Sequence, residues 1–512
     1  MPTCRRGLIL LALFGASCRT PEPKLRPNVL LVTIETLRAD RLASYGYGRL
    51  TTPNLDRLAR QGARFEQAIA QAPFTLPSLA TVMTGLSPPG HGVRNHPATL
   101  RADAPTLAEG LAAAGYRTAA MTRHSWLRRK SGFDQGFAEY HNNKFPVGLD
   151  ARGLSLAGIE WMTAHKDQPF FLWLHFLDPH LPYTPAYPYA ALYHPKLRED
   201  EPVKHLRAMV EQPRENFEPT PYADVERGPY MDLVLPYYPE NPILLDLAFW
   251  RRPRGEIFFG KARYPKAAVA EMGDLYDASL VYTDDNLGRL LRALDDLSLS
   301  NRTLVVVLGD HGEALGEHGL FFTHDFTLYD EVLRVPLVFR FPGRIPPHSV
   351  VSQQVRLMDV APTVLDLLGL PRPPETEGVS LAPALEGRTL PFLPAFAESA
   401  PYRALFPEQE RVYYEGNQGK WRMVRTERWK LVLIPHPKGD LFELYDLISD
   451  PAETKNLYRD LPGEAGKLWP LLKAWLEKDP ERNARGSAEE EKALKALDPA
   501  ELQQLKTLGY LK

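Results

Sequence analysis

Four short polar segments of this sequence carry side chains that could do chemistry. They combine carboxylates, imidazoles and hydroxyls, which can hold a divalent metal ion or attack an electrophilic centre. In open parallel sheets, ligands bind beyond the carboxyl ends of the strands, so polar residues that directly follow apolar runs are the first candidates for a site. The four segments are Glu35-Thr36, residues 75–78 (TLPS), residues 175–180 (HFLDPH) and residues 310–313 (DHGE).

The pair Asp310-His311 follows an apolar run at residues 304–308 and has two interpretations. It could be a polar turn in which a side chain caps the next helix. Adjacent Asp and His residues at the end of a buried strand can also both ligate a divalent ion. The spacing alone does not choose between them.

Thr75 also has two interpretations. It precedes Pro77, which suits the first turn of a helix, so Thr75 is a candidate N-cap. The free backbone N–H groups and the positive end of the helix dipole at such a position favour an anion. A hydroxyl placed there can therefore be both a cap and a nucleophile toward a phosphoryl or sulfuryl centre.

The segments that must position these residues show the pattern of a doubly wound α/β domain. Apolar, β-branched runs typical of strands buried on both faces occur at residues 28–34, 170–177, 304–308 and 337–341. Apolar spacing of 3.6 residues predicts helices at 106–114 and 272–297. This alternation predicts a large, mostly parallel sheet flanked by helices over residues 27–400. Residues 185–265, rich in Pro, Tyr and charge, are expected to form an insertion or lid outside the core.

The pattern changes after residue 400. Short strand-like segments at 423–426, 429–434 and 441–445 predict a small antiparallel sheet. Residues 469–475 and 489–506 predict helices, the last of them rich in Glu, Lys and Leu. That last helix is most simply a solvated face, with partner docking as the alternative. Residues 401–512 are therefore expected to form a C-terminal subdomain.

Composition excludes several classes of function and of metal site. The 512 residues include 61 Lys plus Arg and 63 Asp plus Glu, a formal net charge of −2, so no overall field recruits nucleic acid and no nucleic-acid partner is expected. The two cysteines, Cys4 and Cys18, lie near the start of the chain, which excludes a Cys-based metal site in the folded body. Any metal must be held by carboxylate, imidazole or hydroxyl groups.

The first residues predict an export signal. Arg5 and Arg6 precede an apolar run at residues 8–14 that is too short to span a bilayer, which is typical of a signal peptide over residues 1–18. Small residues before Cys18 resemble the site where bacterial lipoproteins are cleaved and acylated, and a plain secretory signal is the alternative. Residues 19–26 form a polar tether. We expect an exported periplasmic or cell-surface protein, attached to a membrane only through a lipid on Cys18.

Taken in order, the motifs resemble the sulfatase family of the alkaline phosphatase superfamily. The resemblance implies an alkaline-phosphatase-like fold and a metal-dependent hydrolase of small-molecule or glycan esters of sulfuric or phosphoric acid. It covers about residues 27–460 and leaves only the insertion unmatched. The matching motifs are residues 27–40, 44–46, 75–85, 91–92, 132–137, 169–180, 309–319, 329–336 and 443–453.

Residue by residue, the resemblance also implies a site. It implies that His180 contacts the substrate and that His324 assists the leaving group. Arg123 falls where sulfatases keep a basic residue after a strand, and His124 is adjacent, so both are catalytic candidates. His180 could instead only hydrogen-bond within a Pro-rich turn, and Arg123 could be a surface charge. The residues implied to hold one divalent ion (Ca, Mn, Zn or Mg) are Glu35, Thr75, Asp310 and His311. Thr75 is implied to be the nucleophile as well.

Departures from the family pattern bear on the reaction. Sulfatases oxidise a Cys or Ser at the Thr75 position to formylglycine, whose hydrate expels sulfate by collapsing to the aldehyde; threonine cannot follow that route, so no formylglycine is expected. Leu79 replaces the usual Arg. Glu35 replaces the first metal-binding Asp, and Thr36 stands where a second carboxylate is usual.

Three functions remain open from the sequence. Related phosphohydrolases and phosphotransferases use a threonine that forms phosphothreonine, although several need a second metal, for which no clear Asp-x-x-x-His set is present. Water can cleave a phosphothreonine, whereas a sulfothreonine lacks the aldehyde exit, so the chemistry favours phosphoryl transfer. The leading interpretation is an ester hydrolase; the alternatives are a phosphotransferase and a catalytically silent binding protein.

Overall fold

The computed structural model describes residues 26–479 except 96–97, 143–149, 195–199, 213–214, 218, 225–233, 235, 250, 252–256, 259–261, 401–419 and 437–438. The expected signal peptide with Cys18, the expected tether apart from Arg26, and the predicted helix at 489–506 lie outside the described residues. Of the helices that are described, none is both long enough and apolar enough to cross a membrane.

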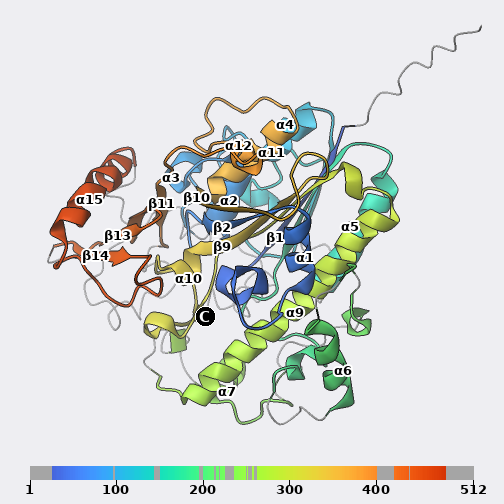
Figure 1. The fold of residues 1–512 in the computed structure, drawn as a ribbon, viewed down its shortest axis with the longest axis horizontal. Helices are drawn as coiled ribbons and strands as arrows, with labels where there is room; N and C mark the ends of the chain where they lie inside the picture. Colours follow the sequence, from blue (N-terminus) through green and yellow to red (C-terminus); the bar gives the residue numbers. More distant parts are fainter. Residues whose placement is uncertain are drawn as a thin grey trace, which may run out of the picture.

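An eight-stranded sheet forms the centre of the molecule, in the order β10-β2-β9-β6-β1-β5-β3-β4 (Figure 1). All neighbouring strands are parallel except at β9, which runs antiparallel to β2 and β6. This confirms the predicted α/β fold with a mostly parallel sheet. The strands are β1 (Asn28–Ile34), β2 (Ala63–Ile69), β3 (Arg117–Thr122), β4 (Glu139–Asn142), β5 (Phe170–Phe176), β6 (Thr303–Gly309), β9 (Arg334–Arg340) and β10 (Ser349–Arg356).

Helices cover both faces of this sheet (Figure 1). On one face α1, α5 and α9 pack together, and on the other α2, α4 and α11 do so. Helix α4 corresponds to the helix predicted at residues 106–114, and it starts with a capping box in which Thr106 and Glu109 exchange hydrogen bonds. The helices are α1 (Pro53–Gln61), α2 (Thr75–Thr84), α3 (Pro88–His91), α4 (Leu107–Ala113), α5 (Ala151–His165), α6 (Glu201–Val210), α7 (Pro242–Phe249), α9 (Lys266–Asp296), α10 (Asp330–Leu333), α11 (Val360–Leu367), α12 (Ala382–Leu385) and α15 (Pro462–Glu477).

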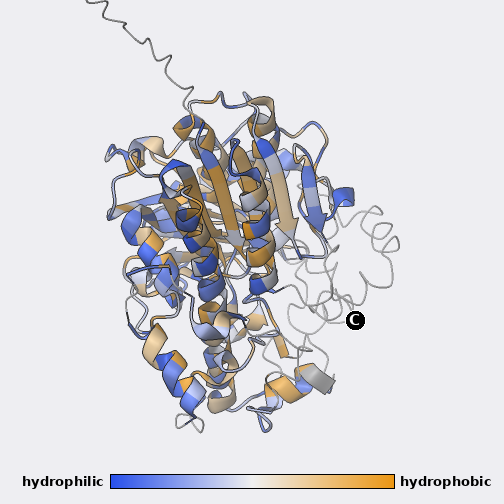
Figure 2. Cartoon of the chain, turned by 90° about the vertical axis from the view of Figure 1, so that its right-hand side faces the viewer, coloured by the Kyte–Doolittle hydropathy of each residue, from blue (hydrophilic) through white to orange (hydrophobic). Residues whose placement is uncertain are grey.

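The core lies along the central strands. Strands β1, β5 and β6 are buried over their whole length, which explains why their sequences are continuous apolar runs rather than alternating ones. Figure 2 shows the same arrangement, with hydrophobic strands behind helices whose outer faces are hydrophilic. The four predicted strand runs correspond to β1, β5, β6 and β9.

Strand register brings three carboxyl ends to one edge of the sheet. Ile34 of β1 pairs with Phe176 of β5 on one side and with Gly309 of β6 on the other. The next residues continue the pairing, because the Glu35 N–H donates to the Phe176 carbonyl at 2.9 Å and the Asp310 N–H donates to the Ile34 carbonyl at 3.3 Å. The polar segments after these strands therefore meet at this edge.

A second, four-stranded antiparallel sheet follows, in the order β11-β12-β13-β14, and α15 packs on it around a separate apolar cluster. Three of its strands were predicted; the fourth, β11, precedes the boundary expected at residue 400. The strands are β11 (Ala395–Glu398), β12 (Arg422–Arg425), β13 (Trp429–Ile434) and β14 (Leu441–Asp446). Two short strands, β7 (Ala314–Leu315) and β8 (Phe321–Thr323), form a hairpin after β6.

The described parts of residues 185–265 differ from the expected insertion outside the core. Tyr189 is fully buried, and its hydroxyl donates to the Asp285 carboxylate of α9 at 2.6 Å. Ile243 and Leu244 of α7 are also fully buried in the main core. The expectation of a segment lying wholly outside the core is therefore wrong, because its tyrosine and aliphatic side chains pack against α9.

Candidate active site

The loop after β1 starts with a residue in an unusual backbone conformation. Thr36 has a φ of 50°, in the left-handed region that β-branched residues rarely adopt. Its N–H donates to Oδ1 of Asp310 at 3.2 Å, and its carbonyl accepts from the Tyr276 hydroxyl at 2.7 Å. This conformation therefore fastens the end of β1 to the end of β6.

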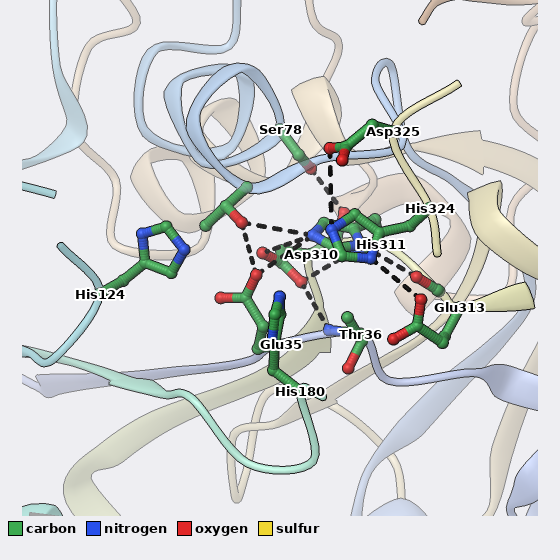
Figure 3. Close-up of polar contacts among 12 residues, drawn as sticks. Glu35, Thr36, Ser78, His124, His180, Asp310, His311, Glu313, His324 and Asp325 are labelled. Carbon is green, nitrogen blue, oxygen red and sulfur yellow. Dashed lines mark hydrogen bonds and ion pairs between the residues drawn. The ribbon is translucent and has the colours of Figure 1, made fainter. Parts of the chain in front are cut away.

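Glu35 divides its two carboxylate oxygens between two sets of partners, of which Figure 3 shows the set that includes His311. Oε1 accepts from the Thr75 hydroxyl at 2.5 Å and lies 3.3 Å from Nε2 of His311. Oε2 lies 2.6 Å from Nε2 of His175. All four residues are fully buried. One carboxylate therefore connects β1 to α2, to the end of β6 and to β5.

Thr75 is the first residue of α2, and its side chain does not cap the helix. Phe74 is the N-cap residue and makes no side-chain capping bond. The Thr75 hydroxyl instead faces Glu35, and its oxygen lies 3.4 Å from Nε2 of His311. One turn further along α2, the Ser78 hydroxyl donates to the Asp310 carbonyl at 2.6 Å, which fixes the helix start against the end of β6. The simple N-cap interpretation of Thr75 is wrong.

His311 presents one ring nitrogen to the cluster. Its Nδ1 lies 3.0 Å from the Gly312 carbonyl, which can only accept, so Nδ1 carries a proton. Its Nε2 lies 3.5 Å from Oδ2 of Asp310 and faces Glu35 and Thr75. This orientation leaves Nε2 as the nitrogen available to a ligand.

The charges in the cluster influence one another. Burial opposes ionisation of Glu35, but the imidazoles of His124, His175 and His311 outweigh it and hold the pKa of Glu35 well below its usual range. Burial and then the charge of Glu35 raise the pKa of Asp310 to about 7. Burial opposes a charged His311, but the two carboxylates outweigh it and raise its pKa to about 10. A cation is therefore favoured between the carboxylates.

A divalent metal ion fits this donor set. Glu35, Asp310 and His311 each offer one ligand atom, and the three atoms lie within 4.8 Å of one another. Oδ2 of Asp310 is buried and, within the part of the chain that the structure describes, has no hydrogen-bond partner. Two carboxylates, an imidazole and a neighbouring hydroxyl are ligands that divalent ions accept. The structure thus brings together the four residues that the sequence predicted as the metal set.

A second group of buried side chains lies beside this cluster. The His324 ring lies 4.4 Å from the His311 ring, and its Nδ1 is 3.0 Å from Oε1 of Glu313. Tyr183 donates to the other Glu313 oxygen at 3.2 Å. Burial lowers the pKa of His324 to about 4 and raises that of Glu313 to about 7. Glu313 faces Nδ1 of His324, and Nε2 on the other side of the ring lies 3.7 Å from Oδ1 of Asp325.

The other predicted site residues lie at different depths. The His180 ring contacts the His324 ring edge to face at 5.4 Å, and its Nδ1 lies 2.6 Å from the Leu181 carbonyl. His124 is fully buried with its ring toward Glu35 (Figure 3), and burial lowers its pKa to about 3. Arg123 is half-buried at the end of β3. The catalytic roles of these three residues stay predictions.

Sequence reasoning missed two residues of this site. His175 was noted only as the start of a motif, yet it is the partner of Oε2 of Glu35. Glu313 was noted within its motif without a role, yet it holds His324. A usable signal for His175 was its position near the end of a wholly apolar strand, where a histidine must find a partner. Glu313 gave no comparable signal, because its partner belongs to a different loop.

Comparison with known proteins gives two matches to family models. Residues 27–370 match the model described as Sulfatase. Residues 316–477 match the model described as N-sulphoglucosamine sulphohydrolase, C-terminal. Together these matches include all the strands of both sheets.

Individual relatives are similar over most of the chain. An N-acetylglucosamine-6-O-sulfatase of Bacteroides thetaiotaomicron is 27% identical, with 88% of this chain and 86% of that protein covered. A choline-sulfatase of Rhizobium meliloti is 27% identical, with 84% and 82% covered.

Two solved structures show the same fold. One is a protein in complex with its substrate D-glucosamine-2-N,6-O-disulfate, with a TM-score of 0.68, 23% identity, and 90% of this chain and 99% of that chain covered. The other is the phosphonate monoester hydrolase of Agrobacterium radiobacter, with a TM-score of 0.67, 22% identity, and 90% and 97% covered.

Proposed function

The chain belongs to the sulfatase family, and from this premise we propose that it is an ester hydrolase in which Thr75 is the nucleophile. The proposed substrates are small-molecule or glycan esters of phosphoric or sulfuric acid, with phosphoric esters favoured. The residues that would hold one divalent ion, of Ca, Mn, Zn or Mg, are Glu35, Thr75, Asp310 and His311.

The position of the Thr75 hydroxyl is the observation that supports this proposal most. It stands at the first residue of a ten-residue helix, is fully buried, and lies within hydrogen-bond distance of Oε1 of Glu35. A cap or a packing residue would have no reason to face a carboxylate and an imidazole together. A divalent ion bound here would make the hydroxyl more nucleophilic and would stabilise negative charge on the ester oxygens.

The chain's own residues suggest how the reaction would proceed. Oγ1 of Thr75 would release its proton to solvent water and form a bond to phosphorus while the bond from phosphorus to the alcohol oxygen breaks, and it would take a proton back when the threonine ester is cleaved. With Glu313 protonated and donating to Nδ1, the neutral His324 ring would carry its proton on Nε2. It would give this proton to the departing alcohol oxygen while Nδ1 takes the proton of Glu313, and the reverse transfers, with a proton from the water that cleaves the threonine ester, would restore both groups. Glu313 would keep the ring in place through Nδ1. The products are the alcohol and inorganic phosphate, and Thr75 is restored.

The preference for phosphoric over sulfuric esters is based on the identity of the nucleophile and not on the fold. The solved relatives with this fold include a protein bound to a sulfated sugar and a phosphonate monoester hydrolase, so the fold accommodates both chemistries. Threonine cannot supply the aldehyde that expels sulfate from formylglycine, whereas water can cleave a phosphothreonine. Glycan sulfates stay in the proposal because relatives are named for that substrate class.

One experiment tests the proposal directly. The purified protein is assayed with Mn²⁺, Zn²⁺, Mg²⁺ or Ca²⁺ against p-nitrophenyl phosphate, bis(p-nitrophenyl) phosphate and p-nitrophenyl sulfate. Samples quenched during turnover are digested and the peptide containing Thr75 is analysed by high-resolution mass spectrometry. Turnover of a phosphoric ester with phosphate on Thr75 is the expected result. Turnover of the sulfate ester alone would overturn the preference for phosphorus, and the absence of both turnover and adduct would favour a silent binding protein.

A further inference from the structure

His175 of β5 has no role in the proposed reaction, yet it is bound to a residue that has one. Its Nε2 lies 2.6 Å from Oε2 of Glu35, and both side chains are fully buried. Oε1 of the same carboxylate faces Thr75 and His311. The carboxylate is therefore held from behind by an imidazole while its front oxygen faces the cluster.

The contact behind His175 continues through two more side chains. Nδ1 of His175 lies 2.8 Å from Oγ1 of Thr33, and Nε1 of Trp173 donates to that oxygen at 3.0 Å. Phe137 stacks on Trp173 at 5.9 Å and fixes the indole. Thr33 and Trp173 are also fully buried.

Strand register places these side chains on one face of the sheet. Thr33 of β1 pairs directly with His175 of β5. Residues two apart on a strand point to the same face, so Thr33 shares a face with the position of Glu35, and Trp173 shares one with His175. Side chains from adjacent strands thus form one line that ends at the carboxylate.

The chemistry of the groups gives this line a direction. An indole N–H can only donate, and an ionised carboxylate can only accept. Thr33 therefore accepts from Trp173 and can donate its own proton to Nδ1 of His175, which leaves the ring proton on Nε2, where it is donated to Glu35. Every donor in the line then has an acceptor, as buried polar groups require.

We propose that His175 is a positioning residue that occupies Oε2 of Glu35 and so presents Oε1 alone to the metal ion and to the Thr75 hydroxyl. This inference rests on the proposed function, since it assumes that Glu35 is a metal ligand. Glu35 is longer by one methylene than aspartate, so its carboxylate has one more rotatable bond to hold. Support for ligands of this kind is commonly worth 10- to 100-fold in metal affinity.

Mn²⁺ affinity, measured by calorimetry on the full-length protein, tests the proposal without an activity assay. His175→Leu removes the donor and should weaken Mn²⁺ binding by 10- to 100-fold. His175→Gln keeps an N–H near the position of Nε2 and should recover part of that loss. Thr33→Val leaves the imidazole but removes its partner, and should weaken binding by less than His175→Leu does.

A matched control separates positioning from packing. Leu174→Ala removes a fully buried side chain from the next position of the same strand, which points to the other face of the sheet. It should lower the melting temperature of the metal-free protein and leave the Mn²⁺ affinity within about twofold of wild type.

The outcomes separate this inference from the proposed function. A wild-type protein that binds no Mn²⁺, Zn²⁺, Mg²⁺ or Ca²⁺ would refute the metal site itself. A wild type that binds Mn²⁺, together with a His175→Leu protein of equal or higher affinity, would overturn the positioning role alone. Equal weakening in His175→Leu and His175→Gln would also overturn it, because the hydrogen bond would then not be the cause.

Discussion

The hydroxyl of Thr75 donates to Oε1 of Glu35 at 2.5 Å, and both residues are completely buried. The two residues come from the start of α2 and from the loop after β1. This contact puts an alcohol next to a carboxylate where the sequence had equally allowed a helix cap. Because of this contact, substitutions of Thr75 can distinguish a nucleophilic role of the residue from a purely structural one.

Thr75→Ala should abolish turnover, by about 10⁴-fold or more, because the group that bonds to phosphorus or sulfur is gone. Thr75→Ser keeps the hydroxyl and should retain activity within about 10²-fold of wild type. Steady-state rates and adduct analysis of the three proteins check this. Equal rates for Thr75→Ala and wild type would contradict a nucleophilic role.

His324→Asn should slow the hydrolysis of esters with poor leaving groups more than that of activated esters. A departing alkoxide needs a proton, and general acid catalysis of this kind contributes about 10²- to 10⁴-fold, whereas p-nitrophenolate leaves without help. The comparison is phenyl phosphate against p-nitrophenyl phosphate for wild type and variant. An equal loss on both esters would argue that His324 acts in substrate binding instead.

Mn²⁺ should stabilise the wild-type protein by about 2.7 kcal/mol at a concentration 100 times its dissociation constant. Asp310→Asn should lose most of this stabilisation. The metal-free variant should nevertheless be at least as stable as the metal-free wild type, because burial and then the charge of Glu35 disfavour an ionised Asp310 and the amide carries no charge. Urea unfolding at pH 8 with EDTA or with Mn²⁺ measures both effects, and equal stabilisation of the two proteins by Mn²⁺ would refute the ligand assignment.

Glu331 should make the protein less stable as the pH rises. Burial, followed by the charge of Glu453, raises the pKa of Glu331 to about 8 from a usual value near 4.5. The folded state then binds this proton more tightly than the unfolded state, so the free energy of unfolding decreases as pH rises from about 4.5 to about 8.

Glu331→Gln cannot ionise and should gain stability relative to wild type across that window, on the order of 1–3 kcal/mol, since one pKa unit corresponds to about 1.4 kcal/mol. Urea unfolding at pH 4.5 and pH 8.5 checks the sign. The control Glu66→Gln, at a partly exposed carboxylate on β2, should change stability little at either pH. A difference between Glu331→Gln and wild type that stays constant with pH would contradict the assigned cause.

Cys18→Ala should release the protein from membranes. Cys18 follows Gly15-Ala16-Ser17, and we propose that it becomes the acylated first residue of an exported lipoprotein. Fractionation of cells that produce wild type or variant, with blotting of the membrane and soluble fractions, measures the distribution. Unchanged membrane association of the variant would contradict Cys18 as the anchor.

The sequence predicted the buried strands of the sheet and the meeting of its polar ends, because buried parallel strands leave a clear signature. The sequence signature of strands β2 and β10 is weaker. They are the last two strands on one side of the sheet, mix buried residues with partly or fully exposed ones, and include the polar residues Gln67, Gln353 and Gln354. Strands of this kind resemble loops in a single sequence.

The site was predictable where each residue followed an apolar run and unpredictable where its role depends on a distant partner. Glu35 and Asp310 follow such runs directly. His175 and Glu313 act through contacts across the sheet edge, with Glu35 and His324, which no local pattern encodes. The segment around Tyr189 resembled a loop for a similar reason. The Tyr189 hydroxyl donates to Asp285, a partner distant in the sequence, and only the fold shows this contact.

The hydrogen bond between Thr36 and Asp310 joins residues 274 positions apart in the chain. The residues of the proposed metal site are therefore not assembled in an unfolded chain, and no short fragment contains them all. Under the proposed function, loading with an ion would have to follow the pairing of β1 with β6, one of the most non-local events in folding this protein. A chain that folds after export would take its ion from the surroundings into which it emerges, so the supply of metals there would decide the occupant together with the donor set.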